Sequence, residues 1–211
     1  KAVRRQRESS EDGGGRQQRD RETAEEQARF AARTGDAYDE LLAEGARYAS
    51  QQDPRRAAKA YREAIALRPD EPEAYFGLGA ALGNSGHYVE AAQRYLEAKE
   101  RYPVGSVGWA TATAWAFTML IQEACAEVAK PEWWNDEDLK ALSKRVVRAA
   151  PENSTSQLMR ALVLSGDEDK LYEDAWEAGP RSAAELKEAA THYERSADLG
   201  AAPAINAQAT R

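Results

Sequence analysis

Apolar residues recur every three or four positions through most of the chain, a spacing that is typical of amphipathic helices. Capping residues mark where the helices begin: Asp36 is a good N-cap, and Pro54 suits a first helical turn. The pattern predicts helices over residues 24–33, 37–51, 54–67, 107–129, 137–149, 155–165, 168–178 and 183–199, and a helix pair between Pro72 and Pro103.

One pattern occurs twice, 34 residues apart, in the consecutive segments 38–71 and 72–105. Small residues, one tyrosine and a closing proline occupy equivalent positions of the two segments. The identical residues are Gly45, Ala46, Ala57, Ala58, Tyr61, Glu63, Ala64 and Pro69, matched by Gly79, Ala80, Ala91, Ala92, Tyr95, Glu97, Ala98 and Pro103. A fixed period of this kind is typical of helix pairs that stack into a solenoid, because one pair cannot bury its apolar face alone.

The second segment closely resembles a tetratricopeptide repeat. Tyr75 stands where the family usually has tryptophan, Leu78 and Gly79 form its leucine-glycine pair, and Gly86 is its turn glycine. The first segment matches as well, with Glu44 in place of leucine. The resemblance implies an all-α protein: a right-handed α-solenoid of antiparallel helix pairs, about 4–5 pairs long, with an irregular C-terminal half.

The rest of the chain follows the repeat pattern less closely. We expect one TPR-like helical domain over 23–200, preceded by a disordered, Arg-rich polar arm and followed by a flexible tail. Its parts are the regular repeats 38–71 and 72–105, the degenerate repeats 106–150 and 154–200, an insertion at 131–138, the arm 1–22 and the tail 201–211.

The composition disfavours some classes of partner and favours one kind of cellular compartment. The net charge of −7 disfavours nucleic acid and anionic membranes as partners of the chain as a whole, and no apolar run is long enough for membrane insertion. The single cysteine, Cys125, excludes an internal disulfide and favours an intracellular location, the cytoplasm or an organellar matrix. Because the first residue is Lys1 rather than methionine, we expect a chain processed or truncated at its N-terminus.

The sequence shows no constellation for catalysis, a metal or a cofactor. His87 and His192 have no cysteine or carboxylate cluster of ligand spacing around them, and Cys125 has no obvious base nearby. The Gly77–Gly79 stretch lies within a predicted helix, where glycines serve packing, so it is no nucleotide-binding loop. We therefore expect no enzyme and no cofactor.

The resemblance implies that the first helix of each repeat faces a concave groove. The expected groove residues that contact a partner are Leu42, Ala46, Phe76, Ala80, Asn84, Ala110, Ala114 and Phe117. Some relatives clamp the C-terminal tails of Hsp70 and Hsp90 with lysine, asparagine and arginine. The residues at those positions here are Leu42, Ala46, Gly77, Val107 and Thr111. Their side chains cannot hold a carboxylate, so these tails are disfavoured.

Two alternatives stay open from the sequence. The apolar groove suits a helical or apolar peptide of a protein partner, or it is filled by the chain's own helix 24–33 or by a later helix. Trp133 and Trp134 are either interface anchors or part of an insertion that folds back on the core. The preferred function is a non-enzymatic interaction scaffold. The alternatives are a structural subunit of a larger complex and, less favoured, a regulatory fragment of an enzyme whose catalytic domain lies outside this chain.

Overall fold

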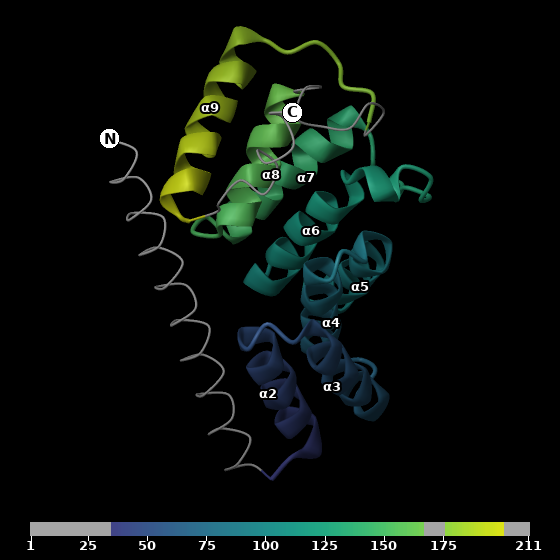
Figure 1. The fold of residues 1–211 in the computed structure, drawn as a ribbon. Helices are drawn as coiled ribbons and strands as arrows, with labels where there is room; N and C mark the ends of the chain where they lie inside the picture. Colours follow the sequence, from purple (N-terminus) through teal and green to yellow (C-terminus); the bar gives the residue numbers. More distant parts are fainter. Residues whose placement is uncertain (1–34, 167–175, 201–211) are drawn as a thin grey trace, which may run out of the picture. The chain divides into compact units, whose positions relative to one another are not determined.

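The computed structural model describes residues 35–166 and 176–200, and these residues form eight α-helices, one short 3-10 helix and no strand. The helices are α2 Ala37–Ser50, α3 Pro54–Leu67, α4 Pro72–Asn84, α5 Tyr88–Arg101, α6 Val107–Leu120, η1 Glu123–Cys125, α7 Asp136–Ala149, α8 Ser154–Ser165 and α9 Ala183–Asp198 (Figure 1). The predicted all-α class is confirmed. The predicted arm 1–22, helix 24–33 and tail 201–211 lie outside the described residues.

The chain divides into two compact units, unit 1 (Lys1–Ser85) and unit 2 (Gly86–Arg211). The division falls in the turn between α4 and α5, inside the second regular repeat. The sequence predicts a single helical domain over 23–200, and those outer boundaries stay a prediction.

In unit 1, α2 packs against α3, α3 against α4, and α2 also touches α4. The ring of Tyr61 on α3 fixes this packing. A Cβ atom built on Gly45 of α2 or on Gly77 of α4 would come within 2.7 and 2.5 Å of that ring, respectively. Both positions therefore need glycine, because the helices approach the tyrosine too closely for any side chain. Burial raises the pKa of Tyr61 to about 12.

Local capping sets the start of these helices, as the sequence predicts. The carboxylate of Asp36 accepts a hydrogen bond from the backbone N–H of Tyr38 at 2.9 Å, and Asp53 accepts one from Arg56 at 3.1 Å. Each cap satisfies an N–H group that has no partner within its own helix.

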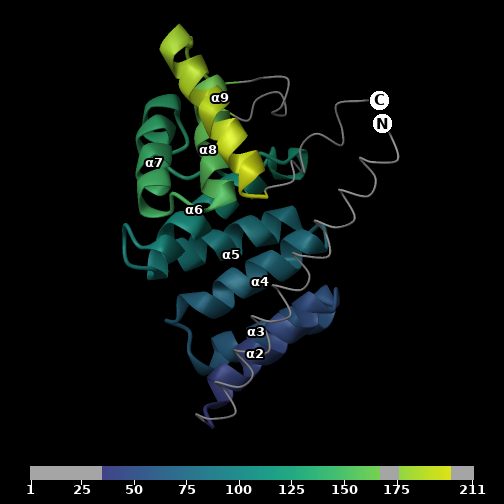
Figure 2. The ribbon, with the colours of Figure 1, turned by 90° about the vertical axis from the view of Figure 1, so that its left-hand side faces the viewer.

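In unit 2, α5 packs on α6, α6 contacts both α7 and α8, and α8 contacts α7 and α9. Figures 1 and 2 both show α8 between α7 and α9. The largest core cluster of the described residues lies here, on α6, α7 and α8. It includes Trp109, Phe117, Leu139, Val146, Met159 and Leu162. Side-chain caps begin two helices of this unit: Asn135 caps α7, and Ser182 with Glu185 forms the capping box of α9.

The helix predicted over 107–129 is wrong in its length, because α6 ends at Leu120. Gln122 has extended backbone angles, and η1 follows. The ammonium of Lys130 donates to the carbonyl oxygens of Leu120, at 3.1 Å, and Cys125, at 2.5 Å. A side chain ten residues away thus satisfies the helix end, which apolar periodicity cannot reveal.

Two further predictions concern a helix in the C-terminal half and the absence of a membrane-spanning segment. Most of the helix predicted over 168–178 lies outside the described residues, and residues 176–182 are not helical. No described helix combines the length and the apolarity that a membrane span requires.

Candidate functional site

The expected groove residues of unit 1 lie on α2 and α4, which are the first helices of the two regular repeats and contact each other. Leu42 and Ala46 of α2 and Phe76 and Ala80 of α4 are half-buried, and Asn84 is exposed at the end of α4. Leu42 also packs against the small core of this unit. The structure therefore places the five predicted residues on two neighbouring helices, and we call them the α2–α4 surface.

The expected groove residues of unit 2 have a different environment. Ala110, Ala114 and Phe117 of α6 are all 0% exposed and belong to the core that α6 forms with α7 and α8. The centroid of the Phe117 ring lies 5.4 Å from that of Trp134 and 5.7 Å from that of Trp176. These three side chains are thus covered by other residues of unit 2.

The two adjacent tryptophans are both partly buried, because the segment that carries them folds back on unit 2. Trp134 points toward the core, and its ring also meets Trp176 edge-on at 6.2 Å. Trp133 lies 5.6 Å from Trp134 and lines a pocket on the outside of the unit. Both tryptophans thus pack as the fold-back interpretation describes, and Trp133 also lines this pocket.

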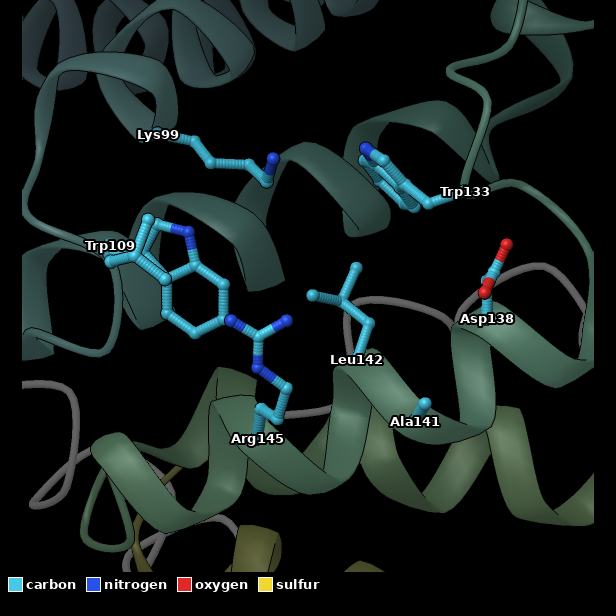
Figure 3. A pocket seen from close by; sticks show the side chains of 8 residues that line it. Lys99, Trp109, Trp133, Asp138, Ala141, Leu142 and Arg145 are labelled. Carbon is cyan, nitrogen blue, oxygen red and sulfur yellow. The ribbon is translucent and has the colours of Figure 1, made fainter.

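This pocket has a volume of about 280 Å3 and is built entirely from unit 2. Its walls come from α5, the turn after α5, α6, the segment before α7, and α7 (Figure 3). Lys99 and Trp109 line one side, Trp133 and Asp138 line the other, and Leu142 lies between them with Arg145 at its edge. We call this cavity the α5–α7 pocket.

Two positive charges dominate the pocket. The Lys99 ammonium lies 5.5 Å from the centroid of the Trp133 ring, and the Arg145 guanidinium lies 5.1 Å from that of Trp109. Burial lowers the pKa of Lys99, and the charge of Arg145 lowers it further, whereas the adjacent Glu100 opposes the shift. Asp138 lines the opposite end and accepts a hydrogen bond from the Asn135 side chain at 2.7 Å.

The two histidines and the cysteine differ in their environments. His192 pairs through Nδ1 with the Gln157 side chain at 2.6 Å, between α9 and α8, and His87 is exposed in the turn before α5. Cys125 is buried, and burial raises the pKa of its thiol, which makes it a poor nucleophile at neutral pH. Among the described residues, no group of three or more histidine, cysteine or acidic side chains could hold a metal ion. The expectations of no catalytic residue and no cofactor stay predictions.

The sequence did not single out Lys99, Trp109 or Arg145 as site residues. Lys99 and Arg145 follow helical spacing on the polar faces of their helices, where lysine and arginine are common. The only available signal was the pair Trp133–Trp134 in an otherwise polar insertion, and Trp133 is one of the residues that line the pocket.

The comparisons with known proteins agree with this architecture. The family described as "TPR repeat" matches residues 45–86, from within α2 to the turn after α4. The chain carries a tetratricopeptide repeat. The tetratricopeptide-like fold extends further, because a solved structure titled "Crystal structure of MamA" matches with a TM-score of 0.51 over 83% of this chain and 85% of that one. Its sequence identity is 14%, so the likeness concerns the fold alone. No curated protein matches the chain by sequence.

The tetratricopeptide-like α-solenoid is the architecture of a protein-interaction scaffold. Stacked helix pairs of this kind present extended surfaces on which another chain can lie. This places the chain in a functional class without naming its partner.

Proposed function

We propose that the chain is a non-enzymatic scaffold that binds a helical or apolar peptide segment of a protein partner on the α2–α4 surface. The observation that carries the proposal is the contrast between the two units. The small and apolar side chains at the groove positions of α2 and α4 keep partial exposure, whereas those of α6 are fully buried.

The chemistry of the α2–α4 surface supports an apolar ligand. Ala46 and Ala80 leave room for a partner to approach the helix backbones, and Leu42 and Phe76 supply apolar area beside them. An amphipathic helix places apolar residues along one face at intervals of three and four, and such a face suits a shallow apolar groove.

The test is a displayed library of amphipathic peptides selected on the wild-type protein. The affinity of the selected peptides is then measured for Ala46→Lys and for Ala66→Lys. Ala66 is exposed on α3, the second helix of the same repeat, so the matched change leaves the α2–α4 surface untouched. We expect Ala46→Lys to lower the affinity by about tenfold or more, because a charge would be desolvated in an apolar contact. Equal affinities for the two variants would overturn the proposal.

A second candidate function is supported by the burial of Phe117 under Trp134 and Trp176. A groove filled by the chain's own residues suits a structural subunit of a larger complex. Size-exclusion chromatography of the native protein separates the two functions, since a sole stable monomer argues against the subunit.

A further inference from the structure

The α5–α7 pocket brings two cations together from opposite walls. Lys99 extends from α5 and Arg145 from α7, and Figure 3 shows both side chains directed at the space between Trp109 and Trp133. In the parts of the chain that the structure describes, neither cation forms an ion pair.

The aromatic rings hold these cations in place without neutralising them. A cation over a ring face gains electrostatic attraction, but the ring offers no carboxylate and leaves most N–H donors unused. Lys99 and Arg145 therefore keep donors for a ligand while their side chains are ordered by Trp133 and Trp109. Ordering before binding reduces the entropy that a ligand must overcome.

The mutual position of the two charges favours an anion. The charge of Arg145 is among the causes that lower the pKa of Lys99, so the two cations destabilise each other. A carboxylate that contacts both would replace this repulsion with two charge-assisted hydrogen bonds. Asp138 does not meet this need, because it lies at the far end of the pocket beside Trp133.

Apart from Lys99, Arg145 and Asp138, the pocket is lined by apolar side chains, so a bare inorganic anion would leave most of it unused. Trp109 is 3% and Leu142 is 8% exposed, whereas Val104 at the edge is 71% exposed. An exposed valine beside two buried apolar side chains suits a ligand that carries an apolar group next to its charge. The volume of about 280 Å3 is at the lower limit of small-molecule sites and fits one or two amino-acid side chains.

We infer that the α5–α7 pocket binds an acidic protein segment, with a carboxylate between Lys99 and Arg145 and an adjacent apolar side chain against Val104 at the edge of the pocket. This site goes beyond the α2–α4 surface, because its residues belong to unit 2 and come largely from α5 and α7, the second helices of their repeats.

A displayed library of random seven-residue peptides tests the inference on the full chain. Selection on the wild type should enrich aspartate or glutamate next to a branched or aromatic residue. The selected peptides should bind Lys99→Gln/Arg145→Gln at least about tenfold more weakly than the wild type, because both charge-assisted contacts are lost. The matched control is Lys144→Gln/Arg148→Gln, which removes the same two charges from exposed positions of α7 outside the pocket. The control should change the affinity by less than about twofold.

Three outcomes would overturn the inference: selected peptides without acidic residues, equal losses in the two double variants, and binding of inorganic phosphate but of no peptide. Far-UV circular dichroism of each variant verifies that the helices are retained. Ala46→Lys should bind the acidic peptides like the wild type. The two sets of variants therefore distinguish a wrong α2–α4 proposal from a wrong inference about the pocket.

Discussion

The carboxylate of Asp136 at the start of α7 holds the guanidinium of Arg181 through two hydrogen bonds, although the two residues are 45 positions apart in the sequence. The Nη1–Oδ2 distance is 2.8 Å and the Nη2–Oδ1 distance is 2.5 Å. Arg181 also donates to the carbonyl oxygen of Val163 on α8. This pair therefore ties the segment before α9 to both α7 and α8.

We expect Asp136→Asn to lower the free energy of unfolding of unit 2 by about 3 kcal/mol, because the Arg181 side chain, 6% exposed, would keep its charge and lose its partner. All five tryptophans lie in unit 2, so urea unfolding followed by tryptophan fluorescence reports on this unit. Glu137→Gln, which changes an exposed neighbour in the same helical turn, is the control and should cost under about 1 kcal/mol. Similar losses for the two variants would contradict the prediction.

The same carboxylate predicts how stability depends on pH in acid. Hydrogen bonds from Arg181 chiefly lower the pKa of Asp136 from 3.8 to about 2. Because this pKa is lowered, the contribution of the Asp136 carboxylate to the free energy of unfolding is present above pH 3.8. It is lost as the pH falls through about 2. The loss is about 2 kcal/mol. Unfolding curves at pH 5, 4, 3 and 2 should show the wild type losing that much more than Asp136→Asn. If stability fell in parallel with pH in the wild type and in Asp136→Asn, the prediction would be contradicted.

We expect Gly77→Ala to destabilise unit 1 by about 1–2 kcal/mol, because the added Cβ would lie 2.5 Å from the ring of Tyr61. The clash should outweigh the gain of about 1 kcal/mol that alanine brings to a helix. Far-UV circular dichroism during thermal unfolding measures the change. In a Tyr61→Leu background the cost should largely disappear, since leucine is smaller than tyrosine. If Gly77→Ala destabilised the Tyr61→Leu variant as much as the wild type, the tyrosine ring would not be the cause of the destabilisation.

The two adjacent tryptophans should differ in what they stabilise. Trp134→Ala should lower the free energy of unfolding of unit 2 by about 3 kcal/mol, because its ring packs on Phe117 and Trp176. Trp133→Ala should cost about 1 kcal/mol and instead weaken the binding of acidic peptides, because its ring orders Lys99. Urea unfolding by circular dichroism and peptide titration measure both effects. Equal stability losses would refute the assignment.

The environment of His192 predicts that stability also depends on pH near neutrality. Burial chiefly lowers its pKa from 6.5, while Glu188 on the same helix opposes the shift and Arg160 on α8 adds to it. The unfolded chain therefore takes up the proton first, so stability is present above pH 6.5 and declines as the pH falls below it. We expect His192→Gln to flatten this decline between pH 7.5 and 5.5, and His87→Gln, which changes the exposed histidine, to leave it in place. A decline that survives His192→Gln would assign it to another group.

Much of the fold was predictable because it depends on local chemistry. Asp36, Asn135 and Ser182 each cap a helix through hydrogen bonds to residues two or three positions away, so the sequence contains the whole interaction. The end of α6 was not predictable, because Lys130 satisfies it from beyond an intervening turn. Apolar periodicity continues past Leu120 and does not mark that end.

The candidate sites also have a part that the sequence predicted and a part that it did not. The family resemblance correctly assigned Leu42 and Phe76 to neighbouring first helices, and binding there stays a prediction. It gave no sign that Phe117, an expected groove residue of α6, would lie beneath Trp134 and Trp176. Whether a groove position is open depends on what packs over it, and the covering residues come from segments that do not follow the repeat.

The sequence by itself thus determined the helices, their caps and the 34-residue period that identifies a tetratricopeptide repeat, because each arises from residues within one or two turns or from a fixed spacing. Only the tertiary structure decided which surfaces are covered and which cations meet. Lys99 and Arg145 are 46 positions apart, and they share a pocket because α5 and α7 both border α6 in unit 2. Charge and exposure at a site are set by packing between distant segments, and neither the period nor the capping pattern records that packing.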